Sequence, residues 1–194
     1  MLEAGETYIP RWDKDMAQRL TELFHLDRKQ RITKLSKGMV SMLQIVVALA
    51  SKADFTFLDE PVSGLDVVAR EAFYRLLLEE FTETERTFVI STHIIEEAAD
   101  IFEEVIFLHE GKILLKENTQ NLLEHSVYVS GKTEAVDRLI QGKQIYCPEV
   151  LGRSKSALVR LREGERLSGG EGVTLQGVNL QKIFVALCGG EERV

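Results

Sequence analysis

The sequence predicts an α/β fold, in which a parallel sheet is flanked by helices and is followed by a small α+β region. Residues 55–58 and 87–91 are short apolar segments that alternate too little for surface strands, which is typical of buried parallel strands. Between them, a helix is predicted by an apolar stripe that consists of Phe73, Leu76, Leu77 and Phe81. With 194 residues, 44% of them hydrophobic, the chain is long enough for one core and a small second unit.

Two helices are expected ahead of the first strand. Asp13 can cap the first, whose apolar stripe consists of Met16, Leu20, Leu23 and Phe24. The stripe fits a free amphipathic arm or a packed helix, and a packed helix is favoured because a loop and a second helix follow directly. That second helix is predicted by residues 40–50, which are apolar nearly all round and indicate burial on most sides.

After the second strand, the sequence predicts a helix over residues 95–102 and a hairpin. The hairpin strands are residues 105–108 and 113–115, with a turn at Glu110 and Gly111. Further on, the order β-α-β-β-α is expected, with these elements at residues 127–129, 134–140, 144–147, 157–161 and 180–187 respectively. A Gly- and Glu-rich loop is expected at residues 163–172. We expect two regions, residues 1–125 and an accessory region of residues 126–194.

Charge and composition argue against several classes of function. The net charge of −7 argues against a partner nucleic acid, which requires clustered lysine and arginine. No apolar run reaches the roughly 18 residues of a membrane span. No leader sequence opens the chain, and Cys147 and Cys188 form no C-x-x-C pair, so we expect a cytoplasmic protein with ordinary buried thiols.

Two carboxylates follow the first predicted strand. Asp59 and Glu60 come directly after residues 55–58 and before Pro61. Ligands of parallel sheets bind outside the carboxyl ends of the strands, where these side chains would lie. A hard cation such as Mg²⁺ prefers carboxylate oxygens, so the segment indicates phosphate and magnesium chemistry. A solvated strand end without function is the alternative interpretation.

Three further segments give these carboxylates a context. In chain order, the four segments are residues 35–39 (LSKGM), 59–60 (DE), 63–66 (SGLD) and 91–93 (STH). Their order and spacing resemble the second half of the ATP-binding subunit of an ABC transporter, over roughly residues 8–125. They look like that family's signature loop, Walker B with its catalytic glutamate, D-loop and switch histidine. The resemblance implies a partial P-loop NTPase sheet with a helical signature subdomain.

The resemblance also implies roles for the acidic residues and the histidine, with ATP and Mg²⁺ as cofactors. Asp59 would hold Mg²⁺, Glu60 would act as general base on the attacking water, and His93 would contact the γ-phosphate. A histidine after a strand is otherwise more often structural.

In this family, two nucleotide-binding domains meet head to tail, and the signature of one closes over ATP held by the other. Ser36, Lys37, Gly38 and Asp66 would therefore face the partner subunit's ATP. Lys37 replaces the usual first glycine and Met39 the usual glutamine. Ser36 and Asp66 also fit simple helix N-caps, and Val40, Ser41 and Met42 stand where the family usually carries glutamine and arginine.

The Walker A loop, G-x-x-x-x-G-K-[S/T], does not occur in the 194 residues. Residues 131–133 (GKT) look like its end, but Ser126 stands where its first glycine belongs, and we predict that Thr133 caps a helix instead. Residues 167–171 (LSGGE) spell the signature better than residues 35–39, yet no helix-then-DE pattern follows, so they are predicted to form a loop. We expect a carboxy-terminal piece of the ATPase that is inactive without Walker A.

The leading hypothesis is an ATP-hydrolysing subunit of an ABC exporter, peripheral on the inner face of the cell membrane through membrane-spanning subunits. Its second partner would be another nucleotide-binding domain, in a homo- or heterodimer. A non-catalytic fragment that only offers a signature surface is one alternative. A soluble ABC ATPase outside transport is another, although the coiled-coil insertions or tandem cassettes usual there do not appear.

Overall fold

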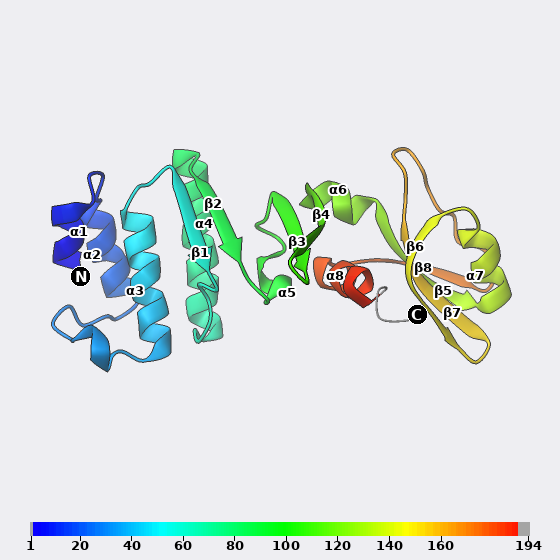
Figure 1. The fold of residues 1–194 in the computed structure, drawn as a ribbon, viewed down its shortest axis with the longest axis horizontal. Helices are drawn as coiled ribbons and strands as arrows, with labels where there is room; N and C mark the ends of the chain where they lie inside the picture. The colour runs from blue at the N-terminus through cyan, green and yellow to red at the C-terminus, as the bar shows by residue number, and fades with distance from the viewer. Residues whose placement is uncertain (1, 190–194) are drawn as a thin grey trace. The chain divides into compact units, whose positions relative to one another are not determined.

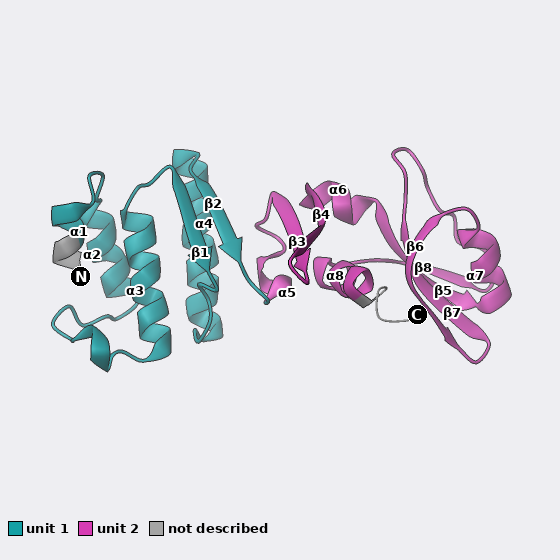
Figure 2. Ribbon diagram, viewed as in Figure 1, with its two compact units in different colours: residues 1–93 teal, residues 94–194 magenta. Residues whose placement is uncertain are grey.

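A computed structural model of the chain describes residues 2–189 and divides the chain at His93 and Ile94 into two compact units (Figure 2). The α/β fold class is confirmed. Each unit is described by itself. None of the helices among the described residues is long and apolar enough to cross a membrane.

The first unit consists of helices and one two-stranded parallel sheet (Figure 1). Its elements are α1 (Leu2–Tyr8), α2 (Lys14–Leu23), the 3₁₀ turn η1 (Ile32–Lys34), α3 (Lys37–Ala50), β1 (Phe55–Asp59), α4 (Val67–Thr84) and β2 (Thr87–Ser91). The helix α2 packs on α3, as expected for a packed helix. Of the predicted apolar stripe, Leu20 and Phe24 are buried, but Leu23 is 43% exposed.

Polar caps begin the three main helices of this unit. The carboxylate of Asp13 accepts a hydrogen bond from the Met16 N–H at 2.9 Å, and that of Asp66 accepts one from the Ala69 N–H at 2.8 Å. The Ser36 hydroxyl accepts one from the Met39 N–H at 3.2 Å. Each cap satisfies an N–H that the first helical turn leaves without an intrahelical partner. The starts of α2 and α4 were therefore predicted correctly, whereas α3 begins at Lys37, ahead of the predicted residues 40–50.

The strands β1 and β2 are covered on one face only, so the prediction of strands buried on both faces is wrong for the described residues. The strands pair in parallel register, with Phe57 opposite Val89. Thr56 and Leu58 point into the core and are 7% exposed each. On the opposite face, Phe55 is 66%, Phe57 75% and Val89 43% exposed. No other described strand pairs with β1, and no described helix covers this face.

A buried cluster of charges, which we call the Arg86 network, ties the core of the first unit together. The Arg86 guanidinium donates to Glu80 at 2.7 Å, to the Thr56 hydroxyl at 3.0 Å, and to three backbone carbonyls near the end of α3. The Lys52 ammonium lies 2.8 and 2.9 Å from the two oxygens of Glu80. Glu80 and Arg86 are almost fully buried, and both have the partners that buried charges require.

The second unit carries a hairpin, a four-stranded sheet and three short helices before its last helix. Its elements are α5 (Ile95–Ala98), β3 (Glu104–His109), β4 (Lys112–Asn118), α6 (Thr119–Glu124), β5 (Ser126–Lys132), α7 (Thr133–Ile140), β6 (Gln144–Leu151), β7 (Ser154–Arg160), β8 (Val173–Gly177) and α8 (Leu180–Gly189). The predicted hairpin is confirmed, with its turn at Glu110 and Gly111. The helix α5 is one turn long rather than the predicted span of 95–102. Both α6 and β8 were missed.

The sheet of this unit has the antiparallel order β6-β7-β5-β8 and is covered on both faces (Figure 1). On one face, α7 supplies Val136 and Ile140 to a cluster with Val129 and Val159. On the other face, α8 and the hairpin pack around Leu158, as a second cluster. The expected order β-α-β-β-α is thus present, with β8 inserted before the last helix.

Residues 131–133 and 167–171, which resemble a Walker A end and a signature in sequence, do not form a loop followed by a helix with those motifs' geometry. Gly131 and Lys132 lie in β5, and the Cβ of any other residue at Gly131 would come within 2.1 Å of the Gly172 carbonyl oxygen. The prediction that Thr133 caps a helix is wrong, because Lys132 is the cap residue and Thr133 already belongs to α7. Residues 167–171 form an irregular loop, as predicted.

Candidate functional site

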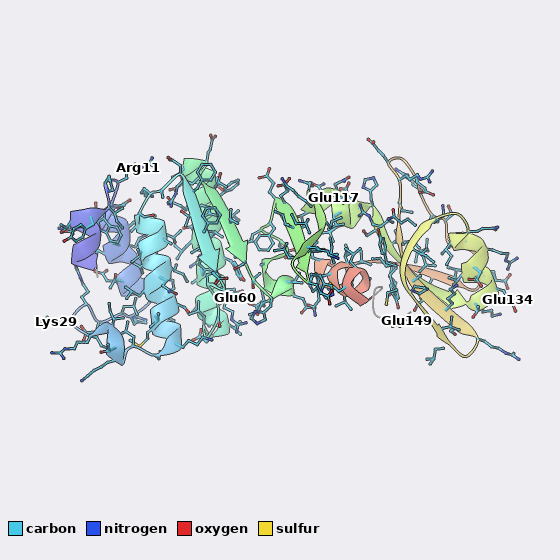
Figure 3. All side chains as sticks on the ribbon, viewed as in Figure 1. Arg11, Lys29, Glu60, Glu117, Glu134 and Glu149 are labelled. Atoms are coloured by element: carbon cyan, nitrogen blue, oxygen red, sulfur yellow. The ribbon has the colours of Figure 1, made fainter. Side chains whose placement is uncertain are left out.

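The predicted site residues all lie in the first unit, at the carboxyl ends of β1 and β2 and at the starts of α3 and α4. Figure 3 labels Glu60, which directly follows β1. The structure brings the residues together in two groups. One contains Asp59, Glu60 and His93, and the other contains the signature loop and the D-loop. The turn after Glu60 connects them, with the Ser63 N–H donating to the Glu60 carbonyl at 3.0 Å.

Glu60 is held by its backbone and by one oxygen of its carboxylate. Its backbone is in the left-handed region, with φ of 46°, and its N–H donates to the Ser91 carbonyl at 2.9 Å. A non-glycine residue rarely adopts this conformation, and such residues cluster at functional sites. Oε1 accepts the His93 N–H at 3.0 Å and lies 2.8 Å from the His93 ring Nδ1. Glu60 and His93 therefore form one structural unit.

The second oxygen of Glu60 is buried and has no hydrogen-bond partner among the residues that the structure describes. Buried polar atoms are nearly always hydrogen-bonded, and leaving one unpaired costs about 1–3 kcal/mol. This oxygen therefore has an unused acceptor position, although almost none of its surface is exposed in this structure. The His93 side chain is 74% exposed, so the same end of the sheet is open to solvent.

Asp59 is oriented by a neighbouring strand. It stands opposite Ser91 in the parallel register, and the Ser91 hydroxyl donates a short hydrogen bond to Asp59 Oδ1. Sequence reasoning gave Ser91 no role, because its contact with Asp59 depends on strand register rather than on spacing along the chain. The Asp59 carboxylate is exposed. Its oxygens fit a hard cation, although residues 2–189 contain no group of three or more His, Cys, Asp or Glu side chains able to hold a metal.

The signature loop lies directly against the D-loop. A Cβ placed on Gly38 would come within 2.5 Å of the Gly64 carbonyl oxygen, so only glycine fits there. Gly64 has φ of +81°, and the alkyl chain of Lys37 packs 3.5 Å from the position of its missing Cβ. Ser36 and Asp66 are N-caps, as their alternative interpretation held. Their additional roles toward nucleotide stay predictions.

Comparisons with known proteins show what the chain is similar to. A family model described as "AAA domain, putative AbiEii toxin, Type IV TA system" matches residues 13–99, the segment that contains all four motifs. The ABC transporter ATP-binding protein YtrB of Bacillus subtilis is 23% identical over 190 residues, which is 95% of this chain and 65% of that protein. The bacitracin transport ATP-binding protein BcrA of Bacillus licheniformis is 30% identical over 180 residues, which is 84% of this chain and 58% of that protein.

A solved structure described as the ATP binding subunit of an ABC transporter superposes with a TM-score of 0.54 at 24% identity, over 63% of this chain and 53% of that one. The chain thus spans less than two thirds of the length of each of these proteins. At this level of identity, the structural similarity shows the fold, and the sequence similarity shows the relationship. The chain is related to the ATP-binding proteins of ABC transporters and has part of the ABC ATPase fold.

Proposed function

We propose that this chain forms the signature-bearing and Walker B part of an ATPase subunit that powers an ABC transporter. The observation that carries the proposal is the Glu60 carboxylate. Two contacts from His93 fix one oxygen, while the other is buried without a described partner. This is the arrangement that a general base needs, because the fixed oxygen sets the direction of the free one.

In the proposed reaction, Glu60 accepts a proton from the water that attacks the γ-phosphate. His93 holds the Glu60 carboxylate in place, and its exposed ring is available to a phosphate oxygen. Asp59, oriented by Ser91, would hold Mg²⁺, which neutralises charge on the phosphates when bound. Phosphoryl transfer depends mainly on positioning and charge neutralisation, so these three side chains cover the tasks of one site except for cradling the phosphates.

We assign the binding of the ATP phosphates to a Walker A loop outside these 194 residues. The signature loop would contact the ATP that the partner subunit holds. Ser36 and Gly38 at the start of α3 would present a hydroxyl, N–H groups and the positive end of a helix dipole to phosphate. Lys37 adds a cation there, and Asp66 lies at the neighbouring start of α4. The partner would be a second nucleotide-binding domain.

Export is the direction that we propose, with membrane-spanning subunits as partners at the inner face of the cell membrane. Its support is the match to relatives named for bacitracin transport and lantibiotic transport, which extends over 84% and 50% of this chain. A relative named for spermidine/putrescine import matches at 30% identity over 68% of this chain, which is less than the 84% covered by the bacitracin relative.

A second candidate function is a non-catalytic fragment that offers only the signature surface. The observation that favours it is the contact of the signature loop with the D-loop at Gly38 and Gly64, which does not involve Glu60. The two candidates differ in whether Glu60 takes part in chemistry.

The test replaces Glu60 by Gln in the complete ATPase that contains this sequence. The substitution keeps the shape and removes the base, so hydrolysis should slow by about 10² to 10⁴ while ATP still binds. Glu71→Gln is the matched control, because Glu71 is an exposed glutamate on α4. Steady-state phosphate release and equilibrium ATP binding are measured for both variants. Near-normal turnover in Glu60→Gln would contradict the assigned role.

A further inference from the structure

We propose that Ser41 is a positioning residue that fixes the D-loop, residues 63–66, against the signature helix α3. This inference rests on the proposed function, because it deepens the roles given there to the signature loop and the D-loop. It treats the two loops as one preassembled surface rather than as two independent contacts to the partner's nucleotide.

Ser41 makes a hydrogen bond to a segment that is distant in sequence. Its hydroxyl donates to the Ser63 carbonyl oxygen at 2.9 Å, across 22 positions of sequence, and the side chain is only 7% exposed. A serine inside a helix usually bonds to the carbonyl four residues earlier or points to solvent. Ser41 instead contributes its donor to the D-loop, so it does more than fill space in the core.

The backbones of α3 and the D-loop approach each other closely beside that bond. Gly38 and Ser41 are three residues apart on α3 and therefore lie on the same helix face. The face presents no side chain at Gly38, where a Cβ would stand 2.5 Å from the Gly64 oxygen. The glycine thus permits the distance at which the Ser41 hydroxyl can reach Ser63.

The other end of the D-loop has its own anchors. Leu65 is 3% exposed, its carbonyl accepts from Arg70 Nε at 3.1 Å, and Asp66 caps α4. Ser63 and Gly64 instead lie against α3. Loss of the Ser41 hydroxyl should therefore loosen Ser63 and Gly64, together with the turn bond from the Leu65 N–H to the Val62 carbonyl that spans them, and leave Asp66 in place.

The kinetic consequence follows from the location of the loop. The D-loop and signature act after ATP has bound to the partner's site, so an incorrectly held D-loop should lower kcat and leave KM for ATP nearly unchanged. A purely structural defect would instead lower the amount of folded protein without this split.

The experiment has two arms and compares variants of Ser41 and Gly38 with matched controls. In the first arm, amide hydrogen exchange is measured by NMR on the 194-residue chain. The probes are the N–H groups of Ser63 and Leu65, which donate to the Glu60 and Val62 carbonyls at 3.0 and 3.1 Å. Ser41→Ala removes the hydroxyl, Ser41→Thr keeps it, and Ser51→Ala removes a hydroxyl from the other end of α3.

We expect Ser41→Ala to speed exchange at Ser63 and Leu65 about fivefold, the factor for one neutral hydrogen bond of about 1 kcal/mol. Ser41→Thr and Ser51→Ala should leave both rates within twofold of the wild type, as should the amides of β2. Gly38→Ala should speed the same amides, whereas Gly170→Ala, with open space around its Cβ position, should not. Unchanged exchange in both Ser41→Ala and Gly38→Ala would overturn the proposal.

In the second arm, turnover of the complete ATPase is measured at saturating MgATP. Ser41→Ala should lower kcat about three- to tenfold with KM within twofold, and Ser41→Thr should restore it. Unchanged kcat in Ser41→Ala would contradict the positioning role. A wild-type assembly that hydrolyses no ATP would instead count against the proposed function, and the exchange arm would then decide the Ser41 assignment by itself.

Discussion

The Arg86 network makes a strong prediction about the stability of the first unit. The perturbation is Arg86→Met, which keeps a long apolar side chain and removes the guanidinium. Arg86 is 5% exposed and donates five hydrogen bonds, three of them to the carbonyls of Ala48, Leu49 and Ala53. The substitution leaves Glu80 buried beside a single cation, Lys52.

The magnitude follows from what the substitution leaves behind. Removing one partner of a buried ion pair costs about 3–5 kcal/mol, because the other charge stays in the interior. Lys52 still contacts both oxygens of Glu80, which places the cost near the low end. The carbonyls that lose a donor raise it again. We expect a loss of about 3–4 kcal/mol in the free energy of unfolding, against about 1 kcal/mol for Lys52→Met, since Glu80 then keeps Arg86.

The assay is urea unfolding followed by tryptophan fluorescence. Trp12 is the only tryptophan of the chain and packs against Gly5 in the first unit, so its signal reports on that unit. Arg75→Met is the matched control, because Arg75 is 68% exposed and its ion pair with Glu79 should contribute under about 0.5 kcal/mol. A loss below about 1 kcal/mol in Arg86→Met would refute the reasoning.

Three further predictions concern the isolated chain. Without a phosphate-cradling loop, it should bind MgATP weakly and not hydrolyse it, so calorimetry that gives micromolar affinity would contradict this prediction. The exposed face of β1 and β2, with Phe55, Phe57 and Val89, should drive formation of a dimer or larger oligomer. Phe57→Lys should weaken this association. Light scattering that shows a stable wild-type monomer would disprove the prediction. The Arg162 N–H and the Lys143 ammonium lower the pKa of Glu165, so this carboxylate stabilises the fold above its ordinary pKa and loses that effect as pH falls through the lowered value. The difference in thermal midpoint between wild type and Glu165→Gln should therefore be constant near neutral pH and shrink in acid, and a difference that grows in acid would reverse the assigned sign.

Helix starts and the hairpin were predictable from sequence because their causes are local. Asp13, Ser36 and Asp66 each cap the helix that follows within three residues. The hairpin turn at Glu110 and Gly111 needs two left-handed residues in succession, with φ of 47° and 75°, and glycine supplies one of them without strain. Such signals are readable over a few positions.

The exposure of β1 and the Arg86 network were not predictable, because both depend on distant parts of the chain. An apolar strand predicts burial, but Phe55 and Phe57 are exposed because no described element covers their face. Arg86 lies six residues after Glu80, yet its acceptors Ala53 and Thr56 precede it by 33 and 30 residues. The strand β8 was missed for a similar reason, since its partner β5 lies about 45 residues earlier.

Within the candidate site, the residue types were predictable and their contacts were not. The order of motifs indicated Glu60 and His93, but only the structure shows that His93 contacts a single oxygen of Glu60 and that the other is buried. The contacts of Ser91 and Ser41 were missed because serine is common in both strands and helices. Their partners, Asp59 and Ser63, are set by strand register and by the close approach of Gly38 to Gly64.

The central claim, that the start of α3 acts on ATP held by a partner subunit, is tested most directly by mixed dimers of the complete ATPase. One subunit carries Ser36→Arg, which places a bulky cation at the exposed N-cap of α3, and the other is wild type. Nucleotide occupancy and single-turnover hydrolysis are measured separately at each of the two sites. The account predicts that the mutant subunit still binds ATP at its own Walker A and that hydrolysis is lost at the wild-type subunit's site. Loss of nucleotide binding at the mutant subunit's own site, with normal hydrolysis at the other, would contradict it.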